Sequence, residues 1–183
     1  MPVSEETFLR VALEEPNQWE LYCGHLRQKP GMTAAHNFLA FELAYELRRQ
    51  LDPHLFQVRV GMGHVRRSAE SYFIPDVFVV PTELVRPKME ELDVLEAYGV
   101  PLPLVVEVWS PSTGGYDLET KLPEYRARGD LEIWRIHPFD HTVTAWRRQA
   151  DGNYAESVFS GGSVEPIALP GVSVDLDALF AIS

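Results

Sequence analysis

The chain has 183 residues, of which 45% are hydrophobic and 23% charged, a size and composition typical of one folded domain rather than of a disordered chain. Its 16 Lys and Arg residues against 27 Asp and Glu residues give a net charge of −11, which argues against a protein that binds nucleic acid through many phosphate contacts. The single cysteine, Cys23, excludes an internal disulfide and a zinc cluster of thiolates.

The N-terminal region does not resemble a targeting segment. Its first residues carry acids where a secretory signal carries basic residues, and no apolar core follows them. Charged residues, Pro or Gly interrupt every apolar run well before the roughly 20 residues that a membrane-spanning helix needs. We therefore expect a cytoplasmic protein without a membrane segment, folded as one domain over residues 1–183.

Two helices and a hairpin are predicted in the N-terminal part. Ser4 is placed to cap a first helix, which Pro16 stops. The short alternating stretch at 19–27, with a glycine near its centre, predicts a β-hairpin. Thr33 is placed to cap a long helix at 34–51, where leucines recur at helical spacing.

The middle of the chain alternates strands with one charged segment. Residues 55–60 alternate apolar and polar side chains, which predicts a half-buried strand in a meander. Residues 71–80 predict a second strand, whose nearly continuous apolar end should lie centrally in the sheet. The charged segment at 82–98 has sparse leucines and is predicted to be partly helical, and 104–109 predicts another buried strand.

A helix is predicted after the turn-rich loop at 110–115, and Pro123 limits where it can begin. Proline is accepted in the first turn of a helix and disrupts the interior. A start at Thr120 places Pro123 early, whereas a start at Asp117 would put a kink there. Gly129 is expected to end this helix.

The C-terminal part predicts a strand, a hairpin and a short helix. Residues 131–137 read as a strand, and 143–148 with 154–159 as a β-hairpin around a turn of Asp, Gly and Asn. Asp175 is placed to cap a last helix through Phe180. Helices placed between strands, together with the hairpins, indicate an α/β fold.

Acidic residues beside apolar strands mark the candidate site. Glu107 lies within the apolar run 103–109, and Asp76 directly precedes the apolar run 77–80. Burying an ionised carboxylate costs several kcal/mol unless it is paired. Carboxylates can hold a divalent cation, and a lysine amine can orient a water molecule or stabilise charge on phosphoryl oxygens. Asp76, Glu107 and Lys121 are therefore a minimal set for phosphodiester hydrolysis.

Several motifs surround these residues along most of the chain. They are Trp19-Glu20-Leu21 with Gly24, His36, Pro75-Asp76-Val77, Glu107-Val108-Trp109-Ser110-Pro111-Ser112-Thr113, Asp117-Leu118 with Lys121, Tyr125 and Gly129, Glu132-Ile133-Trp134, and His137-Pro138. In these motifs the chain resembles the Uma-two family of predicted restriction endonucleases, within the PD-(D/E)XK nuclease superfamily.

The resemblance implies a restriction-endonuclease-like core, in which a mixed sheet is flanked by helices. It also implies that Asp76 and Glu107 bind Mg²⁺ or Mn²⁺ and that Lys121 is the catalytic lysine. The superfamily's lysine two residues after the glutamate is replaced here by Trp109, and the family is thought to supply the lysine from the following helix, where Lys121 lies. Trp109 is then expected to make a hydrophobic contact beneath the site.

Each of the three assignments has a structural alternative. Asp76 can be a strand-entry residue that hydrogen-bonds its own backbone. Glu107 can be half of a buried ion pair with a distant arginine, and Lys121 can be an exposed helix residue. Arginines that could touch a nucleic-acid backbone, although solvated surface charge is the commoner role, are Arg48, Arg49, Arg66, Arg67, Arg126, Arg128, Arg147 and Arg148.

Glu20, His36 and Tyr125 are the supporting candidates. Glu20 is either a surface acid at the hairpin entrance or an acid that supports the metal. His36 shares the spacing of the leucines around it, which favours a core histidine over one that hydrogen-bonds a ligand carboxylate. Tyr125 lies one helical turn beyond Lys121, which favours packing with a polar tip near the site over a phosphate contact.

The first functional hypothesis is a Mg²⁺-dependent endonuclease that cuts double-stranded DNA as a homodimer, because cutting both strands suits two-fold symmetry. The second is a nuclease-fold protein that no longer cuts and serves as a binding or assembly module, which the net charge of −11 favours. A glycosidase that uses Asp76 and Glu107 as its carboxylate pair ranks last, because nothing in the sequence indicates a sugar cleft.

Overall fold

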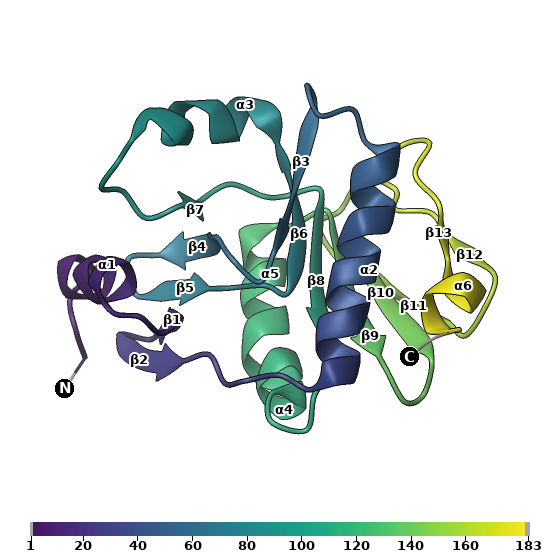
Figure 1. The fold of residues 1–183 in the computed structure, drawn as a ribbon, viewed down its shortest axis with the longest axis horizontal. Helices are drawn as coiled ribbons and strands as arrows, with labels where there is room; N and C mark the ends of the chain where they lie inside the picture. The colour runs from purple at the N-terminus through teal and green to yellow at the C-terminus, as the bar shows by residue number, and fades with distance from the viewer. Residues whose placement is uncertain (1, 182–183) are drawn as a thin grey trace.

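Two β-sheets meet in the computed structural model, which describes residues 2–181 (Figure 1). The larger sheet has six strands, in the spatial order β11 (Tyr154–Phe159), β10 (Thr142–Arg148), β9 (Glu132–His137), β8 (Leu104–Val108), β6 (Val77–Pro81) and β3 (Phe56–Val60). The smaller sheet has five strands, in the order β2 (His25–Gln28), β1 (Trp19–Tyr22), β5 (Ser71–Phe73), β4 (His64–Ser68) and β7 (Ala97–Tyr98). A separate pair is formed by β12 (Ser163–Val164) and β13 (Val174–Asp175).

Helices cover both faces of the larger sheet. The leucines of α2 (Ala34–Gln50) share an apolar cluster with Val77 and Val79 of β6, whereas α5 (Leu122–Arg128) shares one with Phe78 (Figure 1). Alternate side chains of β6 thus enter opposite cores, which explains its continuous apolar sequence. Away from these two helices and the segment that leads into α5, the helical segments of the described chain are α1 (Glu5–Glu14), α3 (Thr82–Val85), a 3₁₀ turn (Arg86–Glu90) and α6 (Leu176–Phe180). Within the described part of the chain, every helix is too short or too polar to cross a bilayer.

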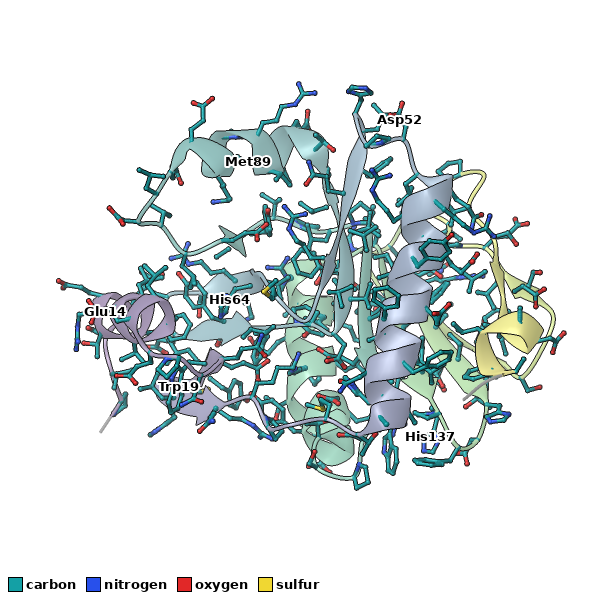
Figure 2. The ribbon with its side chains drawn as sticks, in the orientation of Figure 1. Glu14, Trp19, Asp52, His64, Met89 and His137 are labelled. Atoms are coloured by element: carbon teal, nitrogen blue, oxygen red, sulfur yellow. The ribbon has the colours of Figure 1, made fainter. Side chains whose placement is uncertain are left out.

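Most local predictions are confirmed. The expected N-caps accept hydrogen bonds from the backbone N–H groups of Thr7, His36 and Ala178 through the side chains of Ser4, Thr33 and Asp175. The β1–β2 and β10–β11 hairpins form, and β8 and β9 run parallel around the intervening helix. In the smaller sheet, His64 Nε2 lies 2.9 Å from the carbonyl oxygen of Trp19, which ties β4 to β1 (Figure 2).

The prediction of one strand over 71–80 is wrong. β5 belongs to the smaller sheet and β6 to the larger one, so Ile74, Pro75 and Asp76 carry the chain between the sheets. Proline lacks the N–H that an interior strand must donate, which favours a break at Pro75. This change of sheet places Asp76 at the junction of the two sheets.

The prediction that β3 belongs to a meander is also wrong. β3 lies at the edge of the larger sheet beside β6, because the next strand, β4, joins the smaller sheet. Gly61 and Gly63 turn the chain between these strands with positive φ angles of 56° and 79°. Glycine adopts such angles without the steric cost that a Cβ atom brings.

The helix that carries Lys121 begins earlier than either predicted start, Thr120 or Asp117. It runs from Gly114 through α4 (Gly114–Tyr116), a π-helical turn (Asp117–Lys121) and α5 without interruption. Lys121 therefore lies in the middle of this continuous helix rather than near its N-terminal end.

The π-helical turn explains how the helix passes Pro123. In this turn the N–H of Leu122 donates to the carbonyl of Asp117, five residues earlier. The wider turn relieves the clash that the proline ring would make with the preceding turn of an α-helix, and proline has no N–H that needs an acceptor. The same turn leaves both Asp117 and Lys121 buried.

Trp109 packs against the first turn of this helix. Its indole stacks on the ring of His137 with centroids 4.4 Å apart. A Cβ atom at Gly114 would lie 2.1 Å from the indole Nε1 of Trp109, so the helix can begin here only because residue 114 has no side chain. The tryptophan thus makes a packing contact, and that contact fixes the start of the helix that carries Lys121.

Gly114→Ala is expected to lower the free energy of unfolding by about 1–3 kcal/mol, because the added methyl group overlaps the indole of Trp109. Gly115→Ala is the matched control, since its added Cβ atom would meet nothing within 4 Å beyond its own stretch of helix. We expect the control to be neutral or stabilising by up to about 1 kcal/mol. Urea denaturation followed by circular dichroism measures both variants, and equal midpoints would contradict this role of Gly114.

Candidate functional site

The predicted site residues lie together where the two sheets meet. A cavity of about 10 Å³ is lined there by four carboxylates and two lysines, namely Glu20, Asp76, Glu107, Asp117, Lys29 and Lys121. Asp76, Glu107 and Lys121, which are far apart in the sequence, are thus brought to one point. Glu20 joins them from β1 of the smaller sheet.

Lys121 is the centre of this group. Its Nζ atom lies 2.9 Å from Glu20 Oε1, 3.2 Å from Glu107 Oε1 and 3.8 Å from Asp117 Oδ1. Burial alone lowers the pKa of the amine, but attraction to Glu107, Glu20 and Asp117 raises that pKa well above its usual value. Its side chain is 3% exposed, so the alternative of an exposed helix residue is wrong.

Glu107 lies on β8 with its carboxylate in the cavity. Its partners are Lys121 and Tyr125, whose hydroxyl donates to Oε1 at 2.5 Å, so the alternative of a distant arginine partner is wrong. Burial raises the pKa of Glu107 well above its usual value; Lys121 opposes this shift, and the negative charges of Asp76 and Asp117 add to it.

Asp76 is held by three groups. Its Oδ1 lies 2.9 Å from the amine of Lys29, and its Oδ2 lies 2.8 Å from His36 Nε2 and accepts the backbone N–H of Val108 at 2.8 Å. Burial raises the pKa of Asp76, but Lys29 and the hydrogen bond with His36 outweigh it and hold that pKa well below its usual value. The hydrogen bond from Val108 ties the start of β6 to the end of β8. The Asp76 carboxylate therefore bonds the backbone of another strand, and the alternative that it bonds its own backbone is wrong.

The supporting candidates all contact the group. His36, which the helical spacing favoured as an ordinary core histidine, instead hydrogen-bonds the Asp76 carboxylate. Glu20 is 2% exposed, so the interpretation as a surface acid is wrong. The polar tip of Tyr125 reaches Glu107, while its ring packs edge-on against Phe73 with centroids 6.0 Å apart.

One peptide group connects these contacts. The N–H of Ile74 donates to Glu20 Oε1 at 2.8 Å. The carbonyl of Ile74 accepts from Lys29 at 2.9 Å and from Lys121 at 3.4 Å. Ile74 belongs to the segment that passes between the two sheets, so the change of sheet also supplies a polar group to the cavity.

The sequence did not point to Lys29, and it assigned no role in the site to Asp117. Lys29 follows the first hairpin, and no spacing in the sequence relates it to Asp76. Asp117 stood within the family's motif and could have been found there. Both of its carboxylate oxygens are buried and make no hydrogen bond of ordinary geometry among residues 2–181, although the nearby Thr113 side chain acts to lower the pKa of Asp117. Burial raises the pKa of Asp117 to about 6, against the opposing attraction of Lys121.

The donor set fits a hard divalent cation. Four carboxylates face the amines of Lys29 and Lys121, with Arg27 at the edge of the cavity, so the group has an excess of negative charge when all are ionised. Asp117 presents oxygens that make no hydrogen bond of ordinary geometry within the described residues, and carboxylate oxygens are the ligands that Mg²⁺ and Mn²⁺ prefer. Within residues 2–181, no three acidic, imidazole or thiol groups already form a metal cage.

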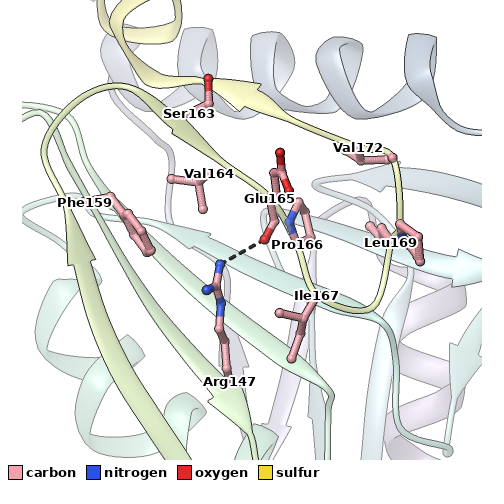
Figure 3. A pocket seen from close by; sticks show the side chains of 11 residues that line it. Arg147, Phe159, Ser163, Val164, Glu165, Pro166, Ile167, Leu169 and Val172 are labelled. Carbon is pink, nitrogen blue, oxygen red and sulfur yellow. Dashed lines mark hydrogen bonds between the residues drawn. The ribbon is translucent and has the colours of Figure 1, made fainter.

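A second cavity, of about 470 Å³, is separate from this group (Figure 3). It lies between β10, β11 and the segment that follows them, and its lining mixes apolar side chains with Arg147, Ser163 and Glu165. Arg147 on its wall is already engaged, with Nε 3.0 Å from Glu132 Oε1 and Nη2 donating to the carbonyl of Glu165 at 2.9 Å (Figure 3). The carboxylate and lysine group is therefore the better candidate site.

The chain belongs to the Uma2 family, which is described as "Putative restriction endonuclease", and the match covers residues 5–178. The fold is similar to the crystal structure of a putative nuclease belonging to DUF820 from Anabaena variabilis, with a TM-score of 0.79, 19% sequence identity and 98% of each chain covered. Over 148 residues the chain is 28% identical to an uncharacterized protein from Synechocystis sp., covering 80% of this chain and 81% of that protein. The fold class inferred from the sequence, a mixed α/β fold of the nuclease type, is confirmed.

Asp117→Asn is expected to stabilise the metal-free protein at high pH. The folded-state pKa of about 6 lies above the ordinary value of 3.8, so ionised Asp117 opposes folding above pH 6, and the penalty disappears below pH 4. The substitution should raise the free energy of unfolding at pH 8 by on the order of 2–3 kcal/mol and by nothing at pH 4. Urea melts in EDTA at pH 4, 6 and 8 measure this; a gain that does not depend on pH would contradict it.

Proposed function

We propose that the protein is a metal-dependent endonuclease that hydrolyses phosphodiester bonds in DNA. The convergence of Asp76, Glu107 and Lys121 on one buried cavity carries the proposal, and membership of a family described as restriction endonucleases supports it. Hydrolysis of a phosphodiester needs a nucleophilic water and neutralisation of charge on the phosphoryl oxygens. A carboxylate pair that holds a cation, with an amine beside it, can supply both.

Asp76 and Glu107 are the residues that would hold Mg²⁺ or Mn²⁺. Such an ion, when bound, supplies Lewis-acid polarisation of the phosphate and lowers the pKa of a water molecule. Lys121 contacts Glu107 at 3.2 Å, and its ammonium can orient the attacking water or stabilise the negative charge that grows on the phosphoryl oxygens.

Glu20, His36 and Tyr125 are proposed to position these three groups. Glu20 holds the amine of Lys121, Tyr125 holds the Glu107 carboxylate, and His36 holds Oδ2 of Asp76. Each contact limits the rotation of a long or rotatable side chain. A site assembled in this way loses little conformational freedom when substrate binds.

We propose double-stranded DNA as the substrate and a homodimer as the assembly, because two copies related by a two-fold axis can cut both strands. The second candidate function is a nuclease-fold binding module that does not cut. It is supported by the net charge of −11 and by the lysine amines that already contact Asp76 and Glu107.

Glu107→Gln and Lys121→Met are each expected to lower the cleavage rate of plasmid DNA by at least about 100-fold in Mg²⁺ or Mn²⁺, because each removes a charged group from the cavity. Asp76→Ala should do the same. The matched controls are Glu119→Gln, an exposed acid in the same helical turn, and Lys88→Met, a lysine outside the cavity. Gel electrophoresis of nicked and linear products measures the rate.

The controls should cleave at the wild-type rate. A wild-type cleavage rate in Lys121→Met would contradict the catalytic role proposed for Lys121. A wild-type protein that binds DNA and metal but leaves the plasmid intact in both metals would favour the binding module instead.

A further inference from the structure

The amine of Lys29 forms an ion pair with one carboxylate oxygen of Asp76, a residue of the proposed metal site. Its side chain is 6% exposed, and its Nζ atom lies 2.9 Å from Asp76 Oδ1 and donates to the carbonyl of Ile74 at 2.9 Å. The backbone N–H of Lys29 bonds the carbonyl of Gln18 at 2.8 Å, which fixes the start of the side chain to the hairpin. The amine is therefore placed on Asp76 by the fold of the smaller sheet.

Asp76 Oδ1 is the oxygen that a cation needs. The other oxygen, Oδ2, already has His36 Nε2 and the N–H of Val108 as partners, both at 2.8 Å. A divalent cation and the Lys29 ammonium are both positively charged and require the same oxygen at close range. They compete for it, because like charges at such a distance repel strongly in a buried site.

Lys29 also borders a second, larger space. A cavity of about 330 Å³ adjoins Asp76, and Lys29, His36 and Phe41 lie on its wall. Asp76 and Lys29 line both this cavity and the small one that contains Lys121. A lysine has a flexible four-carbon chain, so its amine can leave Asp76 and enter the larger cavity while its backbone stays in place.

We propose that Lys29 couples the binding of nucleic acid to the binding of metal. In the free protein its ammonium holds Asp76 Oδ1. A phosphate group of a DNA strand in the larger cavity accepts a charge-assisted hydrogen bond from this ammonium and draws it away, which leaves Oδ1 to the cation. The proposal rests on the proposed function, because it assumes that Asp76 binds metal and that DNA is the ligand.

The coupling has a quantitative consequence. If DNA removes the competitor of the cation, then DNA tightens metal binding, and metal tightens DNA binding by the same factor. Removal of the lysine abolishes the competition, so the metal then binds tightly without DNA. The coupling factor, which is the ratio of the metal affinities with and without DNA, then falls to about one. Couplings between two sites in proteins are commonly about 5-fold to 150-fold.

The experiment compares wild type with Lys29→Met, with Lys88→Met as the matched lysine control. Ca²⁺ is the metal probe because it accepts oxygen ligands, and isothermal titration calorimetry without DNA gives its affinity. Fluorescence anisotropy of a labelled 20-base-pair DNA duplex, in EDTA and in Ca²⁺, gives the coupling factor. Lys29→Met should bind Ca²⁺ at least about fivefold more tightly than wild type, and its coupling factor should be near one.

Lys29→Gln gives the same comparison with a neutral side chain that can still donate to Asp76 and Ile74, and it serves if Lys29→Met does not fold, as judged by circular dichroism. Ca²⁺ affinity equal to or weaker than wild type in the folded neutral variant would overturn the proposal, even if wild type still cleaves DNA. Absence of Ca²⁺ binding in every variant, with no cleavage by wild type, would overturn both the coupling and the proposed function.

Discussion

Four buried carboxylates face two lysine amines where the two sheets meet, and the rest of the molecule is arranged around this imbalance of charge. The smaller sheet supplies Glu20, the larger sheet Glu107, and the helix between β8 and β9 supplies Lys121. An unpaired buried charge costs several kcal/mol, so none of these elements can move without leaving a charge unpaired in another. The ion pairs therefore connect the two sheets in addition to the apolar cores.

Local features of the fold were predictable because they depend on neighbours in the sequence. Ser4, Thr33 and Asp175 cap helices through hydrogen bonds to residues three positions ahead, and Cys23 and Gly24 provide the positive φ angles of the first hairpin turn. Which sheet a strand joins depends on distant partners. The apolar sequence continues from Tyr72 to Val80 with only Pro75 and Asp76 between, so the change of sheet between β5 and β6 leaves only a proline as a local sign.

The site was predictable in part for the same reason. Asp76, Glu107 and Lys121 stand in recognisable motifs, whereas Lys29 reaches Asp76 only after the hairpin has packed on the core. The two predicted starts place Pro123 either in the first turn of the helix or at a kink, whereas a π-helical turn accommodates it in the helix interior. That turn changes which residues share a face, and such a change leaves no periodic signal in the sequence.

The peptide group of Ile74, which bonds Glu20 on one side and two lysines on the other, has a consequence for the order of folding. Its partners come from the first 29 residues and from Lys121 in the later part of the chain, so the contact closes long loops. A chain emerging from the ribosome carries Glu20 and Lys29 well before Lys121 exists, and each charge stays hydrated until its partners arrive. Loss of water from the junction is thus expected to be a late, concerted step that follows formation of the hairpin and of α2.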